Sequence, residues 1–145
     1  MTPKPQLFDN YPSSGKEGEV AVPGGVLHYR LAGSTTSDNV VVFENGWSAS
    51  LSYAVWLEEA LASHARVLFY DRAGIGDSRS TAPLTPDGLT QQLTTLLSSL
   101  GIQQPVVVAG HSYGGLIAAL HAAQAPALVR AVVAYCSPTK GAVMA

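Results

Sequence analysis

The sequence predicts an α/β fold: a mostly parallel sheet with an antiparallel N-terminal hairpin and helices on both faces. Short Val-rich runs alternate with segments whose apolar residues recur at helical spacing, and only a tight turn separates the first two runs. Such alternation is typical of parallel sheets with right-handed crossovers. The chain has 145 residues, 47% of them hydrophobic, which suits one domain with a substantial core.

The first elements are a leader and a hairpin. Residues 1–17 are polar and interrupted by Pro and Gly, so we expect a surface leader, followed by one domain over residues 18–145. Two β-prone runs, Val20–Val22 and Val26–Leu31, flank a Pro-Gly-Gly turn. This pattern predicts the antiparallel hairpin.

A β-α-β unit is expected next. Asn39–Phe43 is a continuous Val and Phe run, typical of a strand buried on both faces. Aromatic residues, Leu and Ala then recur at helical spacing from Tyr53 to Leu61, and a second strand follows at Arg66–Asp71.

The following helix has clear boundaries. Thr85 is a suitable N-cap, Pro86 takes the first helical position, and Asp87 adds an early acid. Leu residues recur at helical spacing until Gly101, which ends the helix.

The last elements are a strand at Pro105–Ala109, a helix at Gly114–Ala125 that Pro126 ends, and a strand at Val129–Cys136. We expect the sheet to end at this last strand. An exposed apolar edge invites pairing with another chain, so we expect self-association there.

Charge and cysteine content narrow the function classes. Only 12% of residues are charged and the net charge is −2, which argues against nucleic-acid and membrane partners. No apolar stretch approaches the roughly 20 residues that span a bilayer, and no secretory signal opens the chain. The single cysteine, Cys136, fits a reducing compartment and is expected to be a small buried hydrophobe. We therefore expect a soluble, cytoplasmic protein.

The strongest chemical motif lies between the last two strands. Gly110-His111-Ser112-Tyr113-Gly114 matches the G-x-S-x-G nucleophile elbow, in the required context of a strand before it and a helix after it. The elbow predicts a strained backbone at Ser112, which Gly110 and Gly114 accommodate because they lack side chains. Ser112 is the candidate nucleophile, and the Tyr113 amide is a candidate oxyanion donor.

With these motifs, the chain from Val20 to Ser137 resembles the N-terminal portion of an α/β-hydrolase with a Ser nucleophile. The loop after Phe43 occupies the place of the family's oxyanion loop, usually written His-Gly-x. Asn45 replaces the common His, Gly46 is retained, and the resemblance makes the Trp47 amide the second oxyanion donor. We expect the Trp47 and Tyr113 amides to converge above the Ser112 hydroxyl.

The loop from Asp71 to Ser78 looks like the family's Asp-x-x-Gly-x-Gly-x-Ser stretch, whose role is mainly structural. Asp71 and Asp77 are therefore expected to cap turns. The loop lacks the third Gly of a dinucleotide fingerprint, and neither a P-loop nor metal-ligand spacing is present, so we expect no cofactor and no metal.

A serine hydrolase also needs an acid and a His, which in this fold follow the Ser in the chain. After Ser112 the sequence contains no Asp or Glu and only one His, His121, more than about two helical turns away. We expect structural roles for His121 and for the other three histidines, His28, His64 and His111. The resemblance then implies an α/β-hydrolase domain that ends after about the sixth strand.

Two functions follow. The first is a serine hydrolase that transfers the acyl group of a small ester-like substrate to water, with this portion alone inactive or very weak. The alternative is a non-catalytic remnant or half-protein that needs a complementing chain.

Overall fold

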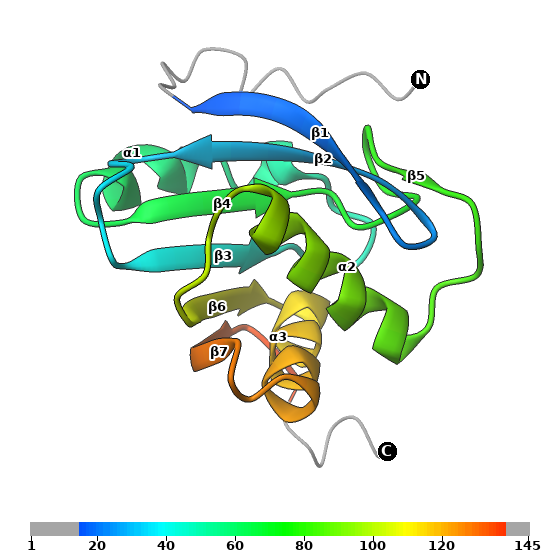
Figure 1. Ribbon diagram of the computed structural model, residues 1–145. Helices are drawn as coiled ribbons and strands as arrows, with labels where there is room; N and C mark the ends of the chain where they lie inside the picture. The colour runs from blue at the N-terminus through cyan, green and yellow to red at the C-terminus, as the bar shows by residue number, and fades with distance from the viewer. Residues whose placement is uncertain (1–14, 139–145) are drawn as a thin grey trace.

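A seven-stranded sheet forms the centre of the computed structural model, which describes residues 15–138 (Figure 1). The strands are Lys16–Val22 (β1), Gly25–Ala32 (β2), Val40–Glu44 (β3), Arg66–Tyr70 (β4), Arg79–Ser80 (β5), Val106–His111 (β6) and Val129–Tyr135 (β7). Their order is β1-β2-β4-β3-β6-β7, and β5 pairs with β2. β1, β2 and β4 pair antiparallel, whereas β4, β3, β6 and β7 pair parallel, as the sequence predicted.

Helices cover both faces of the sheet. In Figure 1, α2 (Pro86–Ser99) and α3 (Tyr113–Gln124) lie in front of the sheet, and α1 (Trp56–Ala62) lies behind it. A 3-10 turn at Leu51–Tyr53 precedes α1. α2 begins as predicted, because the Thr85 hydroxyl accepts a hydrogen bond from the Gly88 amide at 3.0 Å.

Alternation along the strands divides the core between the two faces. On β4, Leu68 and Tyr70 belong to the cluster under α2 and α3, whereas Val67 and Phe69 belong to the cluster under α1. All four side chains are buried. This two-sided burial explains why β3 and β4 appear in the sequence as continuous apolar runs.

The structure corrects three details. β1 begins at Lys16, so the strand starts before Val20 and includes two residues that were expected in the leader; residues 1–14 of that leader lie outside the described residues. The short strand β5 was not predicted. Cys136, expected to be buried, is exposed, because it follows an edge strand whose outer side is uncovered among the described residues. Its φ is 47°.

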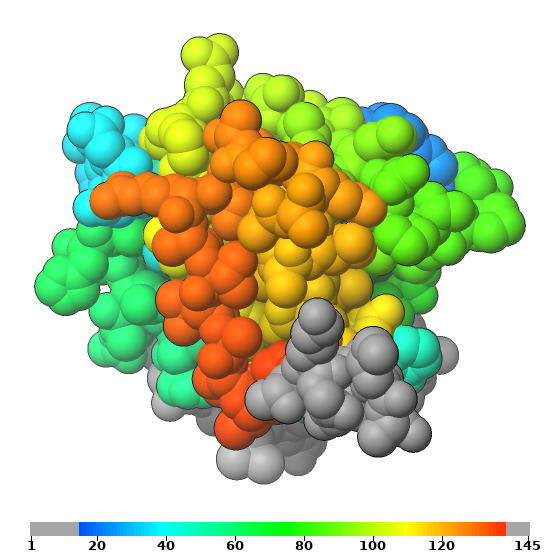
Figure 2. Space-filling view, turned by 90° about the horizontal axis from the view of Figure 1, so that it is seen from below, coloured from blue at the N-terminus to red at the C-terminus, as the bar shows by residue number. Residues whose placement is uncertain are grey.

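The sheet ends at β7, as predicted for the described residues. Figure 2 shows β7, in orange and red, running along the surface beside α3. Val133 is 52% exposed, and Val132 and Tyr135 are also exposed. Among residues 15–138, no helix has the length and apolar character needed to cross a bilayer.

Candidate active site

Ser112 occupies the turn that joins β6 to α3. Its backbone angles are φ 53° and ψ −121°, a sparsely populated region for a residue with a side chain. Such a conformation costs about 1–3 kcal/mol and persists only where the surroundings fix it. The strained backbone predicted for Ser112 is confirmed.

Hydrogen bonds fix this turn from the neighbouring strand. The Ser112 amide donates to the Tyr135 carbonyl at 3.1 Å. The Ser112 carbonyl accepts from the Gly115 amide at 3.0 Å and from the Ser137 hydroxyl at 2.7 Å. The Ser112 hydroxyl makes no capping hydrogen bond to α3, so capping does not engage its oxygen.

Two glycines allow the turn to pack closely. A Cβ on Gly110 would collide with the Gly114 carbonyl, and a Cβ on Gly114 would collide with the carbonyl of Glu44 and lie 2.6 Å from that of Asn45. The start of α3 therefore lies directly against the loop that follows β3. A side chain at Gly114 would push the elbow and that loop apart, and one at Gly110 would distort the elbow itself.

The loop after β3 also borders the nucleophile. A Cβ built on Gly46 would lie 3.8 Å from the Ser112 Cβ and 3.5 Å from the His111 Nδ1, both ordinary contact distances. The rings of Trp47 and Tyr113 meet edge to face, 4.9 Å between centroids. The two residues expected to donate to the oxyanion are thus neighbours; that their amides converge stays a prediction.

Arg72 lies beneath this loop, buried. Its guanidinium donates to the carbonyls of Asn45 at 2.7 Å and Gly46 at 2.8 Å, and to the Glu44 carboxylate at 3.0 Å. It also lies 5.6 Å from the centroid of the Tyr113 ring. One side chain therefore contacts both the loop and the elbow.

Glu44 is fully buried at the end of β3. Its carboxylate contacts Arg72, the Tyr70 hydroxyl and, at 2.8 Å, the Nε2 of His121. Burial alone would raise the pKa of Glu44, but its hydrogen bond to His121, the charges of His121 and Arg72, and the Tyr70 hydroxyl together hold it below the usual value. Burial and the Glu44 charge raise the pKa of Tyr70 well above its ordinary value.

Three of the histidines lie in different surroundings, and their structural roles stay a prediction. His121 is fully buried, and its Nδ1 lies 2.9 Å from the Thr90 hydroxyl, so both ring nitrogens have partners. His111 packs its ring against Tyr135, with 5.0 Å between centroids. His64 is exposed beyond the end of α1.

Asp71 fixes the loop after β4. Its carboxylate accepts from the amides of Leu51 at 2.6 Å and Asp77 at 3.1 Å, and lies 3.3 Å from His28 Nδ1. His28, Asp71 and Asp77 bring potential metal-ligand atoms within 4.8 Å of one another, a grouping that the sequence spacing does not reveal. These hydrogen bonds account for Asp71 as a turn-capping residue, as expected.

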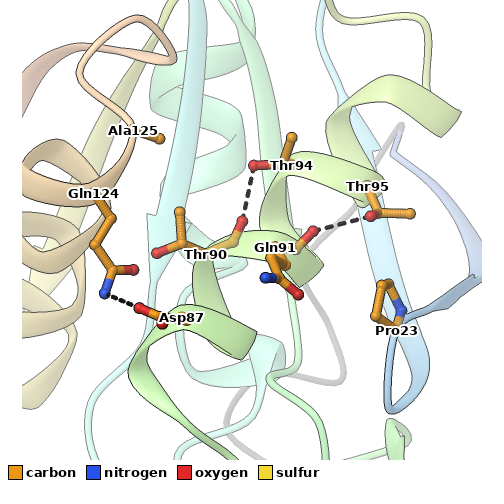
Figure 3. A pocket seen from close by; sticks show the side chains of 8 residues that line it. All are labelled: Pro23, Asp87, Thr90, Gln91, Thr94, Thr95, Gln124 and Ala125. Carbon is orange, nitrogen blue, oxygen red and sulfur yellow. Dashed lines mark hydrogen bonds between the residues drawn. The ribbon is translucent and has the colours of Figure 1, made fainter.

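A shallow groove lies elsewhere, between α2 and α3 (Figure 3). Its volume is about 470 Å³ and its lining includes Asp87, Gln124 and several threonines. Gln124 donates to Asp87 at 2.9 Å, and the hydroxyls of Thr94 and Thr95 donate to backbone carbonyls one helical turn earlier. None of the lining residues belongs to the elbow or to the loop after β3, so the groove is separate from the candidate site.

Sequence reasoning missed the buried polar cluster of Glu44, Tyr70, Arg72 and His121. Two signals were present. Glu44 closes an otherwise apolar strand, and His121 interrupts an almost uniformly apolar helix. A buried charged group needs a partner, so each residue implied another, although the sequence does not say which.

Comparisons with known proteins agree with this fold. A family model for the α/β hydrolase fold matches residues 39–144. The chain is 34% identical over 137 residues to the sn-1-specific diacylglycerol lipase ABHD11 of Mus musculus, covering 92% of this chain and 44% of that protein. It is 31% identical over 108 residues to a proline iminopeptidase of Saccharolobus solfataricus, covering 72% and 34%.

The solved structure of the epoxide hydrolase CorEH has a TM-score of 0.73 and 28% identity, over 83% of this chain and 42% of that one. The chain thus spans less than half the length of each of these proteins. The family match covers most of the chain, and the strands from β3 to β7, the elbow and the loop after β3 lie within it. The chain belongs to the α/β hydrolase fold family.

Proposed function

We propose that Ser112 is the nucleophile of a hydrolase that transfers the acyl group of a small ester-like substrate to water. The strained turn at Ser112, packed against the loop of Gly46 and Trp47, is the observation that supports it most. The strained backbone of a nucleophile elbow places the serine hydroxyl at a helix N-terminus, beside amides that stabilise an oxyanion.

In the proposed reaction, the Ser112 oxygen attacks the ester carbonyl carbon and its proton passes to a His base. The tetrahedral oxyanion accepts hydrogen bonds from the Trp47 and Tyr113 amides. The alcohol leaves with the proton from that His, and water then releases the acid and regenerates Ser112. Esters, thioesters, amides and activated carbon-carbon bonds all suit this chemistry.

The residue type at position 112 favours acyl transfer over epoxide opening. Epoxide hydrolases and dehalogenases of this fold use an Asp nucleophile, and this chain has Ser. The likeness to CorEH therefore extends to the fold, while the chemistry proposed here follows the serine branch.

The experiment that tests the proposal is covalent labelling of Ser112 with a fluorophosphonate probe. The 145-residue chain is combined with a C-terminal segment of a related hydrolase that supplies the acid and the His. We expect weak labelling of the chain alone and a clear rise on adding the segment, because the segment supplies the missing base. Ser112→Ala is expected to abolish labelling; labelling that survives this change would overturn the assignment.

We propose a second role, association through β7, because the apolar side chains of this edge strand are exposed. Backbone groups on the outer side of an edge strand are free to pair with another strand. In the absence of a complementing chain, the expected partner is a second copy of this chain.

This association predicts an oligomer in sedimentation velocity. Val133→Lys places a charge on the exposed strand and is expected to shift the chain toward monomer. Leu84→Lys, at an exposed apolar position on the loop before α2, serves as the matched control and is expected to leave association unchanged. A wild-type chain that sediments as a single monomeric species would contradict the proposal.

A further inference from the structure

Arg72 makes a bidentate contact with the backbone of the loop after β3. Its two terminal nitrogens donate separately to consecutive carbonyls, those of Asn45 at 2.7 Å and Gly46 at 2.8 Å. The Arg72 side chain is only 7% exposed, and hydrogen bonds from a charged donor are stronger than neutral ones. The contact with the Glu44 carboxylate is longer, at 3.0 Å.

Two bonds to the Gly46 carbonyl fix the direction of the next amide: the Arg72 bond at 2.8 Å and a longer bond from the Ala49 amide at 3.3 Å. The Gly46 carbonyl and the Trp47 amide belong to one peptide unit, and among the described residues no peptide bond is cis. In a planar trans peptide the C=O and N–H point in opposite directions. With its carbonyl bound to Arg72, this peptide directs the Trp47 N–H away from the guanidinium.

Arg72 reaches the other half of the site as well. Its guanidinium carbon lies 5.6 Å from the centroid of the Tyr113 ring, and the Tyr113 amide is the other candidate oxyanion donor. Glu44 holds the guanidinium from below, and it is itself held by Tyr70 and His121. Within the buried cluster, the Arg72 guanidinium thus contacts the loop that carries the Trp47 amide and the ring of Tyr113.

We propose that Arg72 is a positioning residue that orients the Trp47 amide toward the developing oxyanion. This inference rests on the proposed function, since it assigns a role within that same site. The competing explanation is that Arg72 only neutralises the buried Glu44. The two differ in geometry: neutralisation needs one positive charge near Glu44, whereas orientation needs two donors at the spacing of consecutive carbonyls.

Arg72→Lys separates these explanations. Lys keeps the positive charge beside Glu44, but its single ammonium does not reproduce the planar fork that binds two carbonyls at once. Arg72→Met removes both charge and fork. Leu96→Ala, in the core under α2, is the control for lost stability, because it leaves a cavity without touching the loop.

The first measurement needs no catalysis. The backbone 1H–15N signals of Gly46 and Trp47 are compared in the unliganded wild-type chain and the three variants. We expect the Trp47 signal to move or split in Arg72→Met and Arg72→Lys, and to stay in place in Leu96→Ala. An unmoved Trp47 signal in Arg72→Met would overturn the inference, whatever Ser112 does.

The second measurement is the rate of fluorophosphonate labelling of Ser112 in the chain combined with the C-terminal segment. For Arg72→Met we expect the maximal labelling rate to fall about 10²-fold, as when one oxyanion donor is removed, with the probe concentration for half-maximal rate unchanged. Arg72→Lys is expected to regain thermal stability but little of the rate. Recovery of stability and rate together in Arg72→Lys, or an equal loss of rate in Leu96→Ala, would overturn the inference.

The two measurements also separate this inference from the proposed function. If wild-type Ser112 is not labelled with the segment present, the proposed function fails and the oxyanion role of Arg72 fails with it. If Ser112 is labelled and Arg72→Met labels at the wild-type rate, only the positioning role fails.

Discussion

Alone, the 145-residue chain is expected to hydrolyse an activated ester on the order of 10⁶-fold more slowly than an intact serine hydrolase. Without a base, the Ser112 hydroxyl stays protonated at neutral pH and is a poor nucleophile. An oxyanion hole and substrate binding by themselves leave a rate roughly 10³ to 10⁴ above that in water.

The positions of the histidines support this expectation. His121 has both ring nitrogens bound, to Glu44 and Thr90, deep in the core. His28 is held by Asp71 and Glu17 on the hairpin side. His111 adjoins Ser112 in sequence and packs its ring against Tyr135, with 5.0 Å between centroids.

The measurement is hydrolysis of p-nitrophenyl acetate by the chain, with Ser112→Ala as the control. We expect the wild-type rate to exceed that of Ser112→Ala only slightly. Rapid hydrolysis that Ser112→Ala abolishes would show that these residues include a base. His111→Ala would then be the first variant to test, because that imidazole is the nearest to Ser112 along the chain.

Local patterns in the sequence predicted most of the fold. The Val-rich runs of β3 and β6 predicted buried strands, and Thr85 with Pro86 predicted the start of α2, because strand burial and helix capping depend on neighbouring residues. The elbow was equally predictable, since its Gly residues and Ser112 are adjacent in sequence. β5 has only two residues, too few to show any period.

The buried polar cluster was not predictable from local patterns. Glu44 ends β3, Arg72 follows β4 and His121 lies within α3. They meet only because the strand order places β3 between β4 and β6. The predicted burial of Cys136 was wrong for a related reason. Its burial depended on what lies beyond β7, and no pattern around Cys136 reports that.

Replacing His121 is expected to cost the fold about 1.5–3 kcal/mol, the usual range for a hydrogen bond to a charged group. His121→Leu fills a similar volume but removes the bonds to Glu44 and Thr90, so Glu44 stays buried with one fewer partner. The free energy of unfolding in urea measures the loss. His64→Leu makes the same change at an exposed position and is expected to leave that free energy nearly unchanged.

The pH dependence of this loss identifies its cause. The pKa of Glu44 in the folded chain lies below 4.5, the value for an unperturbed Glu, so its ionisation stabilises the fold above pH 4.5. This stabilisation disappears as the pH falls through the folded pKa, because Glu44 is then protonated in both states. The difference between wild type and His121→Leu is therefore expected to be largest above pH 4.5 and to shrink below it. A difference that does not change with pH would assign the loss to packing rather than to the Glu44 charge. In that case the double variant Glu44→Gln, His121→Leu would lose an unfolding free energy equal to the sum of the two single losses.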